Sequence, residues 1–128
     1  MASSLDNLLV LDLTEERSGA YATMLLSDNG ARVIRIDSEN SIHIRKSPGF
    51  SVWDRGKETI ILDYENNLID RNRLYKLISI CDVLIEDFAL SSNKQKFINK
   101  NILYTINPKL IHASITVYGK NSLLKNEK

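Results

Sequence analysis

The run Leu8-Leu9-Val10-Leu11 decides the fold of this chain, because it is continuously apolar and does not alternate with polar residues. A strand of this kind is covered on both faces, as in parallel sheets that carry helices on each side. Four similar runs follow at intervals of roughly 25 residues, about the length of one strand with its crossover. They are Val33–Ile36, Thr59–Leu62, Val83–Ile85 and Leu110–Ile115. The spacing predicts an α/β fold, with a parallel sheet of about five strands and flanking helices.

The segments between these runs contain two clear helical patterns, a short helical stretch that ends before Asn107-Pro108, and one long gap. Ser18 is expected to cap a helix that ends at Asn29-Gly30. A second helix has one buried face, formed by Leu74, Leu77, Ile78 and Cys81 at positions i, i+3, i+4 and i+7. Residues 38–56 show no periodicity and are expected to form a long surface connection.

Length and composition place the chain among ordinary globular proteins. Its 128 residues are expected to form a single domain, 1–128. The net charge of +1 gives no basic field for nucleic acid or for an anionic membrane. No apolar run approaches the roughly 20 residues that a membrane span needs, and the first residues do not resemble a secretory signal. The single cysteine, Cys81, excludes an internal disulfide and indicates a reducing, cytoplasmic location.

Few residues form a recognisable chemical motif. His43 and His112, the only histidines, do not belong to a ligand-spaced cluster with Cys81, so no metal site is expected. His112 falls inside a strand pattern, where it is expected to be a packed or edge residue. Carboxylates near the strand ends suit acid–base chemistry, but polar residues also end strands for solvation reasons. These carboxylates are Glu15, Glu16, Asp37, Asp63, Glu65, Glu86 and Asp87.

A series of short motifs goes further than the spacing. The segments Val10–Thr14, Gly19–Leu26 and Gly30–Asp37 resemble the opening of the class III coenzyme A transferases. This family contains the formyl-CoA and carnitine CoA-transferases and the α-methylacyl-CoA racemases. Further matches follow in the same order, at Arg55-Gly56-Lys57, Ile61–Asp63, Cys81–Phe88, Ile106–Ile111, Ser114-Ile115 and Tyr118-Gly119. The resemblance covers nearly the whole chain, but only the N-terminal part of a typical family member.

The resemblance implies a Rossmann-like domain that binds coenzyme A, as free CoA or acyl-CoA, along its strand ends. Backbone amides at a helix start suit phosphate, and apolar strand ends suit adenine. By position, the binding residues are Arg17 and Ser18 at the phosphates or pantetheine, Ser38 near the nucleotide end, Leu62, Asp63, Tyr64 and Glu65 at the adenine, and Asp87, Phe88, Ala89 and Gln95 along the pantetheine path.

The chain also departs from the family pattern. Ser38 and Gln95 stand where family members can have arginines, so cationic anchors for an anionic cofactor are missing. The nucleophilic aspartate of the transferases lies beyond the Tyr-Gly segment. Residues 120–128 contain no aspartate, and Glu127 is their only carboxylate. The resemblance therefore implies no catalytic residue in this chain, which is expected to be inactive in isolation.

Two functions remain open at this point. The first is the CoA-binding part of an enzyme that moves CoA between an acyl-CoA and a carboxylic acid. Its expected protein partner is a C-terminal half or, by self-association, a second copy of the chain. The second is a non-catalytic remnant that acts as a weak nucleotide-binding or assembly module. An unrelated α/β domain is a third, less favoured reading.

Overall fold

A computed structural model describes residues 3–41 and 46–125, so His43 and Glu127 lie outside the described residues. Five strands form one sheet in the order β3-β2-β1-β4-β5. Every pairing is parallel, which confirms the predicted fold class. The strands are β1 Leu9–Asp12, β2 Arg32–Asp37, β3 Glu58–Ile61, β4 Val83–Glu86 and β5 Ile111–Ser114.

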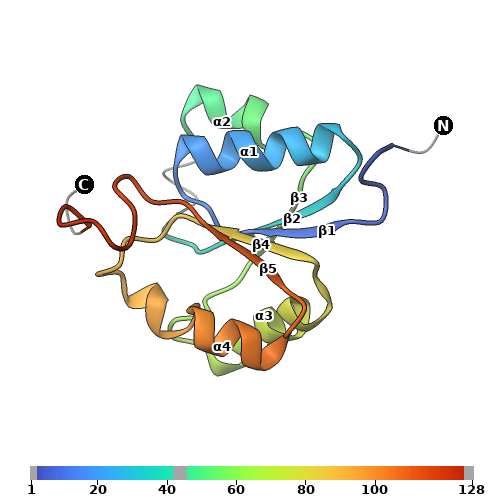
Figure 1. The fold of residues 1–128 in the computed structure, drawn as a ribbon. Coiled ribbons are helices and arrows are strands. Elements are labelled where there is room, and N and C mark those ends of the chain that lie inside the picture. Colours follow the sequence, from blue (N-terminus) through green and yellow to red (C-terminus); the bar gives the residue numbers. More distant parts are fainter. Residues whose placement is uncertain (1–2, 42–45, 126–128) are drawn as a thin grey trace.

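Helices cover both faces of the sheet (Figure 1). The helices α1 (Arg17–Asp28) and α2 (Pro48–Trp53) lie on one face. The helices α3 (Leu68–Ile80) and α4 (Lys100–Ile106) lie on the other, and a 3-10 turn, η2 (Asn93–Lys96), precedes α4. From β1 the chain adds β2 and β3 on one side of the sheet and then β4 and β5 on the other. The strand order therefore changes direction between β1 and β4, and the loops that leave these two strands run to opposite faces of the sheet.

The central strand β1 is buried on both sides, as its continuous apolar run predicts. Val10 belongs to a small apolar cluster that Leu26 of α1 also contacts. Leu11 belongs to a larger cluster on the opposite face, which contains Leu74 and Ile78 of α3. Val10, Leu11, Leu74 and Ile78 are fully buried, and each contributes about 1.5–3 kcal/mol through loss of apolar surface from water. The single cysteine, Cys81, also packs in the larger cluster.

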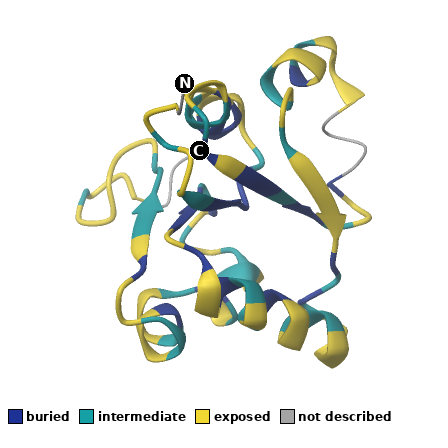
Figure 2. Cartoon of the chain, turned by 90° about the vertical axis from the view of Figure 1, so that its right-hand side faces the viewer, coloured by how far each residue is buried: buried dark blue, intermediate teal, exposed yellow. Residues whose placement is uncertain are grey.

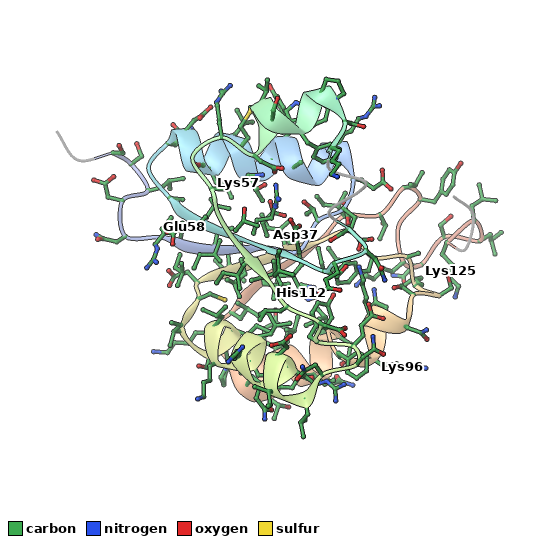
Figure 3. All side chains as sticks on the ribbon, turned by 180° about the vertical axis from the view of Figure 1, so that it is seen from behind. Asp37, Lys57, Glu58, Lys96, His112 and Lys125 are labelled. Carbon is green, nitrogen blue, oxygen red and sulfur yellow. The ribbon has the colours of Figure 1, made fainter. Side chains whose placement is uncertain are left out.

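A buried polar layer separates the sheet from α1 and α2. The side chain of Lys57 is fully buried, and its ammonium group lies 3.0 Å from Asp12 Oδ2 and 3.2 Å from Asp54 Oδ1. It also donates to the carbonyl of Ala20, 3.1 Å away. Lys57 therefore ties the segment before β3 to β1 and α1, and Figure 3 shows it between the helical layer and the sheet.

Two local expectations were wrong. Residues 38–56 are not structureless, because α2 begins at Pro48 within them. Proline is favoured in the first turn of a helix, but six residues are too few to show a helical period. Ser18 does not cap α1, which begins at Arg17 with Glu16 in the N-cap position.

Candidate functional site

The turn after β1 is held by a buried carboxylate. Asp12 accepts hydrogen bonds from the Thr14 N–H (2.9 Å) and from the Thr23 hydroxyl (2.7 Å). The turn also requires glycine at position 19, since a Cβ there would lie 2.3 Å from Thr14 Cγ2. These contacts bring the first turn of α1 against the strand end and fix the direction of its N-terminus.

Asp87, which follows β4, caps the start of α1 in place of Ser18. The Asp87 carboxylate accepts the N–H groups of Glu15 and Glu16, each at 2.8 Å. Ser18 is therefore not needed to satisfy these donors. Sequence reasoning could not find this contact, because Asp87 lies 72 residues from Glu15 and 71 from Glu16 in the chain.

The Asp87 carboxylate is partly buried, and this burial raises its pKa to about 6. The Glu16 N–H hydrogen bond acts in the opposite direction, while the negative charges of Glu16, Asp12 and Glu86 add to the increase in pKa. This end of the sheet therefore carries an excess of negative charge close to the start of α1.

The turn after β4 is held in a similar way by Glu86, which is fully buried. One carboxylate oxygen accepts the Phe88 N–H at 2.8 Å, and the other lies 3.1 Å from His112 Nε2 on β5. Burial acts to raise the pKa of Glu86, but its hydrogen bonds, first of all the one with His112, outweigh burial and leave the pKa lowered. His112 is thus a packed residue on an edge strand, as expected.

Lys94 joins the two loops. It forms an ion pair with Glu15, and its ammonium group lies 5.0 Å from the centre of the buried Phe88 ring. Desolvation lowers the pKa of Lys94. The pair connects the loop after β4 to the start of α1, which fixes the separation of the two loops.

Between these loops lies a cavity of about 640 Å³. It opens at the carboxyl ends of β1, β4 and β5, beside the change of strand direction, where open α/β sheets bind ligands. Lys125, from the C-terminal segment, also lines it and lies at this end of the molecule in Figure 3. The lining residues are Glu15, Glu16, Arg17, Ser18, Asp87, Phe88, Ala89, Leu90, Ser91, Ile115, Thr116, Val117 and Lys125.

Five of the residues proposed from the sequence line this cavity together: Arg17, Ser18, Asp87, Phe88 and Ala89. The other six do not line it. They are Ser38, Leu62, Asp63, Tyr64, Glu65 and Gln95.

Most of these six lie further along the same edge of the sheet. Ser38 follows β2 and exchanges hydrogen bonds with Ser41. The segment 62–65 follows β3, and Tyr64 is buried in the core, where desolvation raises its pKa. The Gln95 side-chain amide donates to the Phe88 carbonyl at 3.3 Å. The segment Ile115–Val117 was missed, although the rule that ligands bind at strand ends applies equally to β5.

Residues 3–41 and 46–125 contain no helix of the length and apolarity that a bilayer span requires. The same residues contain no cluster of three or more His, Cys, Asp or Glu side chains placed to hold a metal ion.

Comparison with known proteins connects this geometry to one family. The CoA-transferase family III pattern matches residues 5–128. The chain is 34% identical to succinyl-CoA:mesaconate CoA-transferase from Haloarcula hispanica, over 91% of this chain and 32% of that protein. It is also 34% identical to acetyl-CoA:oxalate CoA-transferase from Acetobacter aceti, over 93% of this chain and 33% of that protein.

Two solved structures have the same fold as this chain. A hypothetical protein (Rv3272) from Mycobacterium tuberculosis superposes with a TM-score of 0.88 at 27% identity, over 99% of this chain and 37% of that one. A CAIB/BAIF family protein from Brucella suis gives a TM-score of 0.88 at 28% identity. The chain spans about a third of the length of the curated relatives that it matches. On these matches, the chain belongs to CoA-transferase family III and corresponds to one part of its longer members.

Proposed function

We propose that the cavity at the ends of β1, β4 and β5 binds the pantetheine arm and thioester end of an acyl-CoA. The observation that carries this proposal is the position of the cavity, at the change of strand direction in a CoA-transferase family fold. Phe88, Ala89 and Leu90 supply apolar surface, and Ser18 and Ser91 supply hydroxyl groups. This mixed lining suits a flexible chain of methylene and amide groups.

The rest of the cofactor would extend along the sheet edge toward β2 and β3. Ser38 follows β2 and the segment 62–65 follows β3, and we assign the nucleotide end and the adenine to them, as the family resemblance implies. Asp87 already occupies the N–H groups of Glu15 and Glu16, so these donors are not available to a phosphate. We assign phosphate binding to the Arg17 guanidinium, which lies one residue further along.

In the proposed reaction of the whole protein, CoA passes from an acyl-CoA to a carboxylic acid. This chain supplies cofactor binding. Residues 120–128 do not contain the aspartate that the family uses as nucleophile, so we expect no turnover by the chain alone. A second candidate, a non-catalytic binding or assembly module, is favoured by one observation: Glu15, Glu16 and Asp87 place three carboxylates around a site for an anionic cofactor.

Calorimetric titration with CoA tests the proposal. We expect a micromolar Kd, equivalent to about 7–8 kcal/mol. Ala89 is exposed and lines the cavity, so Ala89→Trp should fill it and abolish the binding heat without unfolding the chain. Arg17→Gln should weaken CoA about tenfold but leave pantetheine binding unchanged. Lys100→Gln, on the exposed start of α4, is the matched control. Absence of binding at millimolar CoA would refute the cofactor site and favour the assembly module.

A further inference from the structure

The strand β3 forms one edge of the sheet and is uncovered along its whole length. All four of its residues are exposed, in contrast to the buried strands β1 and β4 (Figure 2). Ile61 keeps 51% of its surface accessible. An open edge strand presents unpaired backbone groups and is a template for another strand.

The hydrogen-bonding pattern shows which backbone groups are open. Leu62 donates its N–H inward to the Asp37 carbonyl on β2, at 2.8 Å. Because inward and outward groups alternate along a strand, the N–H and C=O groups of Thr59 and Ile61 point outward. Within the described residues, the sheet continues no further than β3 on this side.

The neighbouring backbone groups limit how far a new strand can pair. The Lys57 N–H donates to the Asp54 carbonyl at 3.3 Å, and the Asp63 N–H donates to Asp70 Oδ2 at 3.0 Å. The open segment therefore contains two outward residues, Thr59 and Ile61. An antiparallel copy of the same strand pairs Thr59 of each chain with Ile61 of the other, about a two-fold axis at Ile60.

An apolar groove of about 510 Å³ runs beside this edge, between β3 and α3. Its floor contains Ile60, Leu62, Leu77 and Ile80, and Ile80 is 67% exposed. Ile60 lies on the groove side of β3, so the two-fold axis would bring two Ile60 side chains together over the grooves. An exposed apolar surface of this kind marks an interaction site.

The charges are complementary in this register. Glu58 would lie opposite Leu62 of the second copy, on the α3 face of the sheet. Because α3 runs back along β3 from its carboxyl end, Arg73, the most N-terminal residue of α3 in the groove, lies on the Leu62 side. In this register, Glu58 of each chain would lie toward Arg73 of the other. Their present partners, Arg32 and Asp70, form exposed pairs, which are weak and leave both side chains able to turn.

We propose that two copies of this chain associate through antiparallel pairing of β3, with reciprocal Glu58–Arg73 contacts, to form one continuous sheet. The second copy is favoured over an unrelated peptide because both the open backbone groups and the charges are self-complementary. The proposal does not rest on CoA binding, and the interface lies away from the cavity that β1, β4 and β5 form.

Sedimentation equilibrium of the full chain tests the interface. Wild type is expected to dimerise as its concentration rises. Thr59→Pro removes an outward N–H, and Ile61→Lys places a charge on the edge, so each should raise the dimer Kd at least tenfold, about 1.4 kcal/mol. Circular dichroism should show that both variants remain folded. Ile111→Lys, at the opposite edge on β5, is the control and should dimerise like wild type.

Charge exchange gives the sharper result. Glu58→Arg and Arg73→Glu should each be monomeric alone, because each creates like-charge contacts across the axis. A mixture of the two should dimerise, since both reciprocal contacts are then between opposite charges. A wild-type chain that stays monomeric, edge variants that dimerise normally, or a mixture that stays monomeric would each overturn the proposal.

Discussion

Replacement of Lys57 by methionine tests the buried polar layer. Methionine keeps most of the apolar stem but removes the ammonium group that faces Asp12 and Asp54. The Asp12 side chain is fully buried, and Asp12 accepts hydrogen bonds from Thr14 and Thr23 that the substitution leaves in place. Loss of one partner from a buried ion pair costs about 3–5 kcal/mol, because the remaining charge stays buried without its counterion.

Urea unfolding provides the assay, followed by far-UV circular dichroism and by the fluorescence of Trp53, the only tryptophan. With a slope of about 2 kcal/mol/M, a loss of 4 kcal/mol moves the midpoint down by about 2 M. Lys100→Met, on the exposed start of α4, is the matched control and should leave the midpoint within about 0.5 kcal/mol of wild type.

A double-mutant cycle separates the charge from the packing. Asp12→Asn removes the carboxylate, so the double variant should be more stable than the sum of the single effects predicts, by about 0.5–3 kcal/mol. If Lys57→Met costs no more than Lys100→Met, or if the cycle is additive, the ion pair does not hold β3 to β1 and α1, and the reasoning is refuted.

Four further outcomes are expected. Burial raises the pKa of Asp87 from the ordinary value of 3.8 to about 6 in the folded chain, so the unfolding free energy should fall as pH rises between these values. Asp87→Asn should remove this fall, but it keeps only one of the two oxygens that accept the Glu15 and Glu16 N–H groups, so the pH profile is the test and not the absolute stability. An unchanged pH profile would contradict the raised pKa. Gly19→Ala should lose about 1–3 kcal/mol in urea unfolding, because the new Cβ meets Thr14, whereas a neutral effect would show that the turn relaxes. Leu103→Ala, at a fully buried site, should cost about 2–5 kcal/mol by the same measurement, and a smaller loss would show that the core collapses around the cavity. Burial raises the pKa of the Cys81 thiol to about 12, so alkylation at pH 8 should be far slower in the folded chain than in urea, and equal rates would refute its burial.

The strands could be predicted from the sequence because burial on both faces leaves a continuous apolar signal. β1 and β4 show this directly, and the boundaries of β3 moved by only one residue. The helix α2 gave no such signal, because it is short and begins with Pro48-Gly49.

The candidate site was only partly predictable. The residues at the ends of β1 and β4 follow from the rule for parallel sheets, and five of them line the cavity. The roles of Asp87 and Lys57 depend on partners far away in the sequence. Lysine is also usually exposed, and spacing alone gives no sign that the ammonium group of Lys57 is buried.

The position of β1 has a consequence for synthesis of the chain. Of the five strands in this sheet it comes first in the chain, yet it lies in the middle of the sheet, between β2 and β4. During synthesis, one edge of β1 can therefore form its backbone hydrogen bonds with β2 early. The other edge can pair with β4 only after residue 83 has emerged. During that interval an apolar strand stays open on one side, and it is the segment that chaperones would be expected to protect.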